Sequence, residues 1–320
     1  MTLSSAKRII SFLPSATEMV CALGLGDRLV GVTHECDYPP EVKGKPVVVR
    51  NVLPVERMAQ SEIDLAVAQR MREGLSLYEV DEELLTSLSP DLIVTQNLCQ
   101  VCAPSGNEVT HALKLLTKEP RILWLTPHSI AEIWENLREL GQATGRTDQA
   151  EALIASGESR LENLRAASHT LTSRPRVFCQ EWLDPVYASG HWMPEMVEIA
   201  GGTDELAKAG ADSVRISWDE LIEWAPELLI ITPCGFNLEQ TVEQASSFFV
   251  SPGSTSSNPP AAFFDIPAVR NGRVFAVDAN SYFARPGPRV VEGTELLAHL
   301  IHPEAFKWNG PRAFQRLEFQ

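Results

Sequence analysis

The chain contains one pattern twice: a short amphipathic helical segment, then a proline, then a short run of aliphatic residues. The first copy occupies residues 83–95 and the second residues 218–232. Aliphatic runs of this kind are typical of parallel strands covered on both faces. A helix that leads into such a strand belongs to a β-α-β unit, and β-α-β units build parallel sheets. Two copies far apart in the sequence therefore predict two α/β lobes of similar build rather than one sheet.

The beginning of the chain contains a complete β-α-β unit. Residues 8–13 form a short apolar strand, and a helix should then run to about Gly24. Ser15 and Glu18 have the spacing of a capping box, in which the hydroxyl and the carboxylate satisfy free amides at the start of a helix. Residues 29–33 form the next strand, so the first sheet should be parallel.

Composition limits the class of protein. The chain has 320 residues, of which 44% are hydrophobic and 22% charged, enough for a large core in two domains. The net charge of −15 and the lack of clustered Lys and Arg exclude a nucleic-acid partner. No apolar run approaches the roughly 20 residues that span a bilayer.

The amino terminus suggests a location. The first eight residues run directly into the first predicted strand and contain no export signal, which predicts a cytoplasmic protein. A leader removed before this sequence begins would make the protein periplasmic or extracellular instead.

The longest helical stretch lies in the middle of the chain. Residues 148–167 contain no proline, and a helix of that length spans roughly 30 Å. Its apolar residues at helical spacing are Ala152, Leu153, Leu161 and Leu164. Such a helix can act as a stiff spacer, so we predict an N-terminal lobe over residues 1–146, a connecting helix over 147–170 and a C-terminal lobe over 171–320.

Five of the six cysteines fall at or just beyond the carboxyl end of a predicted strand, where open α/β folds bind ligands. They are Cys36, Cys99, Cys102, Cys179 and Cys234. The spacing of Cys99 and Cys102 lets two thiolates reach one tetrahedral ion, and thiolates favour zinc or an iron–sulfur cluster. Cys21, in an apolar helical run, and Cys179, inside its strand, are more simply core residues.

Two other interpretations of the cysteines remain open. Buried free cysteines often behave as small hydrophobic residues. Alternatively, Cys99 and Cys102 form a redox pair ahead of a helix whose amino terminus lowers the pKa of a thiol. Four residues separate the pair from that helix, whereas the thioredoxin motif lies at the helix start.

Aromatic residues gather in the loop that follows the predicted strand 176–181. Trp182, Tyr187 and Trp192 could stack on a ligand or seal the loop against its lobe, and His191 is a candidate ligand contact. Arg285 could pair with an anionic group. The sequence contains no G-x-S-x-G, phosphate loop or H-E-x-x-H motif, so no catalytic residue is predicted.

The order of several short motifs resembles the class III substrate-binding proteins of ABC importers, which bind vitamin B12, haem, siderophores and some metals. The motifs that carry this resemblance are residues 8–18, 23–32, 37–40, 90–94, 184–190, 201–202, 225–231 and 282–289. Within the class, the vitamin B12-binding members resemble the chain best. The resemblance implies two α/β lobes with mainly parallel sheets, a single long helix joining them, a ligand cleft between the lobes and no catalysis.

The chain departs from the B12-binding members in its first lobe. Where their loops offer aromatic side chains, residues 34–36, 71–73 and 96–99 here read His-Glu-Cys, Met-Arg-Glu and Gln-Asn-Leu-Cys, so aromatic stacking from this lobe is mostly lost. The second lobe retains its aromatic residues, including Tyr282 and Phe283. The resemblance also implies docking to a permease, if the protein is exported, through one acidic residue on each lobe, for which Glu79 and Glu220 are the nearest candidates.

We therefore expect a non-catalytic solute-binding protein that holds a corrinoid or metal-containing ligand in the cleft. The expected ligand contacts are Glu35, Trp182, Tyr187, His191, Trp192, Tyr282, Phe283 and Arg285. The expected metal ligands are Cys36, Cys99, Cys102, Glu181 and Cys234. The bound group would be cobalamin or another corrinoid, zinc, or an iron–sulfur cluster. The alternatives are a cytosolic metal or iron–sulfur carrier or sensor, and a thiol redox enzyme using Cys99 and Cys102.

Overall fold

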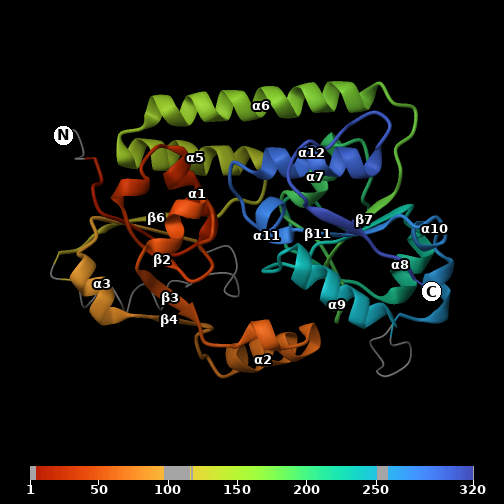
Figure 1. The fold of residues 1–320 in the computed structure, drawn as a ribbon, viewed down its shortest axis with the longest axis horizontal. Helices are drawn as coiled ribbons and strands as arrows, with labels where there is room; N and C mark the ends of the chain where they lie inside the picture. The colour runs from red at the N-terminus through yellow and green to blue at the C-terminus, as the bar shows by residue number, and fades with distance from the viewer. Residues whose placement is uncertain (1–4, 97–115, 117, 251–258, 320) are drawn as a thin grey trace. The chain divides into compact units, whose positions relative to one another are not determined.

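The computed structural model describes residues 5–96, 116, 118–250 and 259–319 (Figure 1). The chain divides into two compact units. Unit 1 comprises Met1–Met58, Leu65–Pro127 and Ala131–Ser156, and unit 2 comprises Ala59–Asp64, His128–Ile130 and Gly157–Gln320. Each unit contains one six-stranded sheet with helices packed on it. The expected two-lobed α/β fold is confirmed.

The sheet of unit 1 is mainly parallel, as expected. Its strands follow the order β4-β3-β2-β1-β5-β6, and only β3 and β4 pair antiparallel. The strands are β1 (Ile9–Ser11), β2 (Leu29–Thr33), β3 (Val47–Asn51), β4 (Tyr78–Val80), β5 (Leu92–Thr95) and β6 (Arg121–Trp124). The helices that begin in or accompany this unit are α1 (Pro14–Ala22), α2 (Gln60–Arg72), α3 (Glu82–Leu88) and α5 (Ile130–Thr144).

The sheet of unit 2 is mixed, so the expectation of a mainly parallel sheet is wrong here. Its order is β12-β11-β10-β7-β8-β9, in which the β11–β10 and β10–β7 pairs are parallel and the other three are antiparallel. The strands are β7 (Val177–Trp182), β8 (Tyr187–Ala188), β9 (Val214–Arg215), β10 (Leu228–Ile231), β11 (Val274–Val277) and β12 (Phe314–Arg316). The short strand β8 runs back along β7, β9 pairs with β8, and β12 pairs with β11 near the end of the chain.

The repeated sequence pattern is also a structural repeat. The N-cap residues of helices α3 and α8 (Trp218–Trp224) are Asp81 and Ser217. The side chain of each accepts a hydrogen bond from a backbone N–H of the first turn. Both helices end at a non-glycine residue in the left-handed conformation, Ser89 with φ 44° and Ala225 with φ 51°. A proline follows each of these residues and prevents the helix from continuing. The strands that follow, β5 and β10, each pair with parallel strands on both sides.

The first helix begins differently from the prediction. Its N-cap is Leu13, which makes no side-chain capping hydrogen bond, and Pro14 occupies the first turn. Proline is favoured there because its ring already has a helical φ angle and the missing N–H would be unpaired. Ser15 and Glu18 therefore lie inside the helix, where both are buried, and do not form a capping box.

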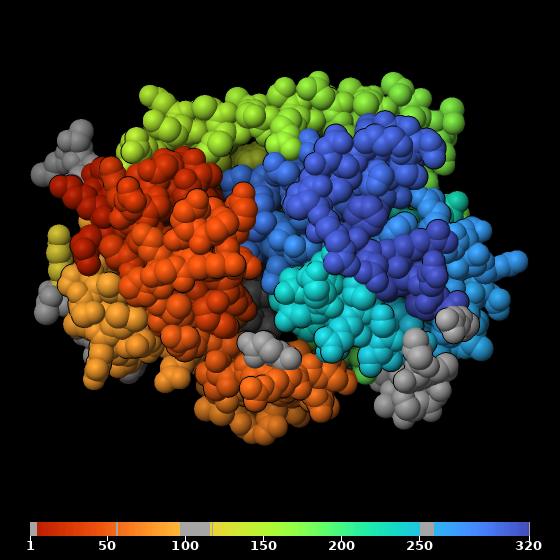
Figure 2. Space-filling model, viewed as in Figure 1, coloured from red at the N-terminus to blue at the C-terminus, as the bar shows by residue number. Residues whose placement is uncertain are grey.

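The long helix α6 (Thr147–His169) occurs where the connecting helix was expected, and the division between the two units falls within it. Its buried residues follow helical spacing: Ala150, Ile154, Gly157, Leu161, Leu164 and Ser168. Of the stripe expected from sequence, Ala152 is exposed and Leu153 is half-buried. Figure 2 shows the exposed surface of this helix in yellow-green. The domain boundaries themselves stay a prediction.

The core of unit 2 contains a cluster of aromatic residues. Phe249 and Phe263 stack with ring centroids 5.3 Å apart and an interplanar angle of 5°, and Phe319 meets Phe249 edge to face. The remaining helices of this unit are α7 (Met193–Ile199), α9 (Leu238–Val250), α10 (Pro267–Arg270), α11 (Ala279–Tyr282) and α12 (Val290–Ile301).

Helix α12 approaches the end of α11 closely because Gly293 has no side chain. A Cβ atom at Gly293 would overlap the backbone carbonyl oxygen of Tyr282 and lie 2.9 Å from Cε of Met196. The next carbonyl along, that of Phe283, accepts a 2.9 Å hydrogen bond from Nε1 of Trp192. The position of Trp192, just before α7, therefore depends on this close contact.

We expect Gly293→Ala to destabilise the protein by roughly 1–3 kcal/mol, because the added methyl must displace backbone. In a helix without such a contact, the same change stabilises by about 1 kcal/mol. Urea unfolding followed by circular dichroism measures the difference. Ser159→Ala, on the exposed face of α6, is the control and should stay within about 0.5 kcal/mol of wild type. A Gly293→Ala protein as stable as wild type contradicts the close packing.

Candidate functional site

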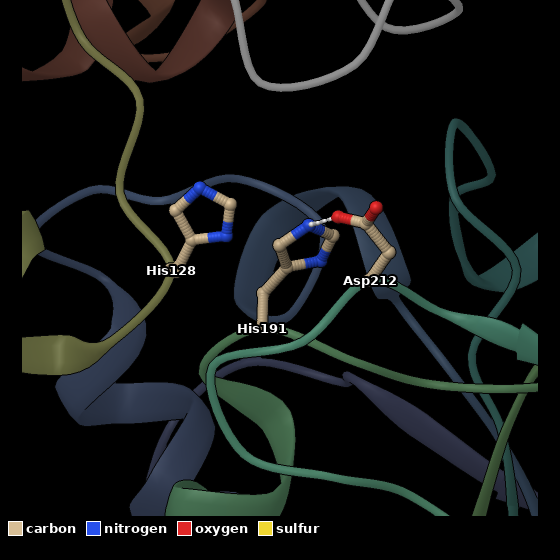
Figure 3. A group of neighbouring side chains, drawn as sticks. All are labelled: His128, His191 and Asp212. Atoms are coloured by element: carbon tan, nitrogen blue, oxygen red, sulfur yellow. Dashed lines mark ion pairs between the residues drawn. The ribbon is translucent and has the colours of Figure 1, made fainter.

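Two histidines and one aspartate gather in unit 2. One ligand atom from each of His128, His191 and Asp212 lies within 4.8 Å of the other two, and no other group of this kind occurs in the part of the chain that the structure describes. Nε2 of His191 lies 3.3 Å from Oδ1 of Asp212, and the two imidazole centroids are 5.5 Å apart. Figure 3 shows the His191 ring between the other two side chains.

Gly190 brings the backbone of His191 against that of Asp212. A Cβ atom at position 190 would overlap the carbonyl oxygen of Ala211 and lie 2.5 Å from backbone atoms of Asp212 and Ser213. The N–H of His191 donates a 2.6 Å hydrogen bond to the Ala211 carbonyl, and the His191 carbonyl accepts a 3.0 Å bond from the N–H of Gly210. The two loops are therefore fixed to each other by backbone, independently of their side chains.

The backbone of His191 adopts a conformation that few non-glycine residues adopt. Its φ angle is +54°, in the left-handed region. For a residue with a Cβ atom this conformation costs energy and persists only where the surroundings impose it, most often at functional sites. The two backbone hydrogen bonds to residues 210 and 211 supply that constraint.

His128 comes from a different part of the chain, between β6 and α5. Two residues later, the N–H of Ile130 donates a 3.0 Å hydrogen bond to a carboxylate oxygen of Glu195. Glu195 lies in the first turn of α7, the helix that begins directly after the loop of His191. This bond holds the start of α5, and with it His128, beside His191.

Glu181 supports the loops of the site from β7 rather than joining the three-residue group. Its Oε2 accepts a 2.7 Å hydrogen bond from the hydroxyl of Ser213, whose oxygen in turn accepts a 3.1 Å bond from the N–H of Gly190. Burial raises the pKa of Glu181 to about 7, although the bonds from Ser213 and Gly190 oppose the shift. Glu181 thus connects β7 to both loops, and its role as a metal ligand stays a prediction.

The surroundings of His191 favour its neutral form, because they lower its pKa. Burial lowers its pKa, and the neighbouring His128 adds to this, whereas Asp212 acts in the opposite direction. Its Nε2 is buried and, despite the nearby Asp212 oxygen, makes no hydrogen bond of acceptable geometry. A neutral imidazole with an unused ring nitrogen is the form that binds metal ions.

Most of the predicted aromatic contacts are packed inside the protein. Trp192, Tyr282, Phe283 and Arg285 are each no more than 8% exposed. Trp182 and Tyr187 are half-buried and keep some accessible surface. Trp182 meets Phe236 edge to face at 5.8 Å and donates from Nε1 to the carbonyl of Gln60 at 3.2 Å. The guanidinium of Arg215 lies 5.6 Å from the centre of the Tyr187 ring.

In unit 1, Cys36 is buried, and its Sγ lies 3.0 Å from the hydroxyl oxygen of Thr17. Glu35 beside it is half-buried, with its carboxylate 4.0 Å from Nε2 of His34. These observations leave the role of Glu35 in ligand binding a prediction.

The other described cysteines are free and belong to no group of metal-binding side chains among the described residues. Cys179 is fully buried, and burial raises the pKa of its thiol well above the usual value. Burial likewise raises the pKa of Cys21 to about 11. Cys234 is half-buried, and Cys99 and Cys102 lie outside the described residues.

The sequence prediction included His191 but missed His128 and Asp212. His128 lies four residues after β6, so the strand-end criterion applied to the cysteines would have found it. Asp212 has no such signal, because it is 80% exposed and belongs to an irregular polar loop. Only the close approach of Gly190 brings it to the site.

The sequence profile of the periplasmic binding protein family matches residues 9–281. The chain belongs to this family. It is 28% identical over 312 residues to an uncharacterized ABC transporter substrate-binding lipoprotein of Bacillus subtilis, which covers 94% of this chain and 82% of the relative. It is also 25% identical over 293 residues to the vitamin B12-binding protein of Vibrio cholerae, with 91% of this chain and 87% of the relative covered.

The fold agrees with this assignment to the periplasmic binding protein family. The structure of a periplasmic haem-binding protein from Roseiflexus sp. RS-1 superposes with a TM-score of 0.68 at 22% identity, covering 94% of this chain and all of that one. Family members bind solutes and are not enzymes, which confirms the expected lack of catalysis and leaves the thiol redox alternative without support.

The relatives bear on the expected location. One relative is named a lipoprotein and the family is described as periplasmic, so a cytoplasmic location has no support among them. Among the described residues, no helix combines the length and apolar character needed to cross a bilayer.

The loop that carries Asp212 begins at a second enclosed carboxyl group, that of Asp204. Its Oδ1 accepts hydrogen bonds from the N–H groups of Leu206 at 3.1 Å and Ala207 at 3.2 Å. Burial nevertheless raises the pKa of Asp204 from 3.8 to about 7. Between about pH 4 and pH 7 the carboxyl group therefore carries a proton in the folded protein but not in the unfolded chain. The free energy of unfolding consequently falls as the pH rises through that range.

We expect Asp204→Asn to remove this loss, because the amide oxygen keeps both hydrogen bonds and carries no charge. The free energy of unfolding of Asp204→Asn should exceed that of wild type by an amount that grows from pH 4 to pH 7.5 and reaches on the order of 1–4 kcal/mol. Urea unfolding at a series of pH values measures it. Asp204→Ala is the matched control, since it also lacks the charge but loses the hydrogen bonds and should be destabilised at pH 4. If Asp204→Asn follows the wild-type pH dependence, the carboxyl group is not enclosed.

Proposed function

We propose that this protein is the solute-binding component of an ABC importer and that its solute is a corrinoid or a related metal-containing macrocycle. The observation that carries the proposal is the similarity to a vitamin B12-binding protein over nearly the whole chain, in a family whose members bind solutes. The half-buried Trp182 and Tyr187 support it, because flat apolar ligands bind to accessible aromatic rings. We also infer that the protein works outside the cytoplasm, where its relatives are named to be.

The permease contacts belong to the same proposal. Glu79 in β4 and Glu220 in α8 are both exposed, as a docking residue must be. Glu220 has a structural role as well, because its carboxylate accepts hydrogen bonds from the N–H and the hydroxyl of Ser217 at the start of its own helix. A docking test at this position therefore needs Glu220→Gln, which can retain an acceptor oxygen, rather than Glu220→Ala.

A metal carrier is the second candidate function. The observation that favours it is the group formed by His128, His191 and Asp212, which contains no cysteine. The thiolate version of this candidate rests on Cys99 and Cys102, which lie outside the described residues, together with Cys36 and Cys234.

We expect saturable binding, one ligand per chain, for at least one of cobalamin, cobinamide and haem, measured by absorbance titration and by native mass spectrometry. Trp182→Ala should weaken binding about tenfold, because one aromatic contact contributes roughly 0.5–1.5 kcal/mol beyond its buried area. Trp124→Ala removes an exposed tryptophan of β6 and should leave the affinity unchanged. Failure of all three macrocycles to bind contradicts the proposed solute class.

A further inference from the structure

We propose that His128, His191 and Asp212 form a binding site for one first-row divalent cation of the Zn²⁺ type, with a coordination position left open. The site lies wholly within unit 2, and it uses none of the cysteines. It does not depend on the identity of the macrocyclic solute.

The spacing of the ligand atoms fits such an ion. Zinc binds imidazole nitrogen and carboxylate oxygen at about 2.0–2.2 Å, so two ligand atoms of a tetrahedral site are about 3.4 Å apart. Nε2 of His191 and Oδ1 of Asp212 are 3.3 Å apart. His128 offers a ligand atom within 4.8 Å of a ligand atom of each of the other two residues. Two of the three ligand atoms therefore already have the separation that the ion requires.

The types of ligand select the class of cation. Two imidazoles and one carboxylate suit borderline metals such as Zn²⁺, Co²⁺ and Ni²⁺, whereas Ca²⁺ and Mg²⁺ require mostly oxygen ligands. A set of three protein ligands is typical of zinc sites that keep a fourth position for water or another molecule. Asp212 is 80% exposed, so an ion held here is accessible to a further ligand from solution.

The surroundings hold the first ligand in place before any ion arrives. His191 is fixed by backbone hydrogen bonds to residues 210 and 211, in a left-handed conformation that the loop imposes. Ser213 and Glu181 fasten the loop of Asp212 to Gly190. Such supporting contacts are what distinguish metal sites from chance groups of polar residues, and their loss typically weakens binding 10–100-fold.

The test is a titration of the whole protein with Co²⁺ and then Zn²⁺, with no macrocycle present. Calorimetry gives the stoichiometry and affinity, and the absorption spectrum of Co²⁺ identifies its ligands, because thiolates add an intense charge-transfer band that imidazole and carboxylate do not. We expect one ion per chain, no thiolate band, and displacement of Co²⁺ by Zn²⁺.

Three variants remove one ligand each while keeping the fold. Asp212→Asn changes an exposed side chain, His128→Ala shortens a half-buried one, and His191→Asn introduces a residue that tolerates the left-handed backbone. Each should weaken Co²⁺ binding by more than about 100-fold, beyond the effect of losing a supporting contact. His169→Ala, at the exposed end of α6, and Asp219→Asn, exposed in α8, are the matched controls and should bind as wild type does.

Two outcomes overturn the proposal: no stoichiometric binding of Co²⁺ or Zn²⁺, or binding with a thiolate band that persists in the three variants. The second outcome would assign the ion to cysteines. Because no macrocycle is present, neither outcome bears on the solute class. Conversely, a protein that binds Co²⁺ as expected but none of the three macrocycles retains the metal site and loses the proposed solute.

Discussion

The second lobe is organised around the contact between the backbone at Gly190 and that at residues 211–213. No residue with a side chain fits there, because a Cβ atom would overlap the Ala211 carbonyl. The contact aligns the N–H of His191 with that carbonyl and places Asp212 opposite the imidazole. It also brings Ser213 between Gly190 and the buried carboxyl of Glu181, so that a strand of the sheet and two loops are connected through one hydroxyl group.

The fold could be predicted from the sequence where local signals and tertiary contacts agree. The strand Leu29–Thr33 was predicted at its observed bounds, since short apolar runs between turn residues have few other solutions. The repeated helix–proline–strand pattern was predictive for the same reason. Strand β12 was not predicted, because its three residues, Phe-Gln-Arg, carry little strand signal of their own and form a strand by pairing with the edge of β11.

The candidate site was less predictable than the fold because its ligands do not share a local pattern. The cysteines drew attention through their positions after strands, yet Cys36 and Cys179 are buried, and Sγ of Cys36 lies 3.0 Å from the hydroxyl oxygen of Thr17. His128 occupies the same kind of position after β6 and was overlooked because a single histidine carries little information. What unites His128 with His191 is the bond from Ile130 to Glu195, which no spacing in the sequence reveals.

The metal-binding group and the aromatic residues are connected physically, although they were inferred from different signals. Trp192 follows His191 directly, its ring lies 5.6 Å from the imidazole, and its Nε1 is held by the Phe283 carbonyl. That carbonyl is positioned in turn by the contact between Gly293 and Tyr282. Trp192, held by the Phe283 carbonyl, therefore packs beside the imidazole of His191 and supports its loop. A site supported in this way can hold the imidazole of His191 in position for an ion, and it needs no cysteine to do so.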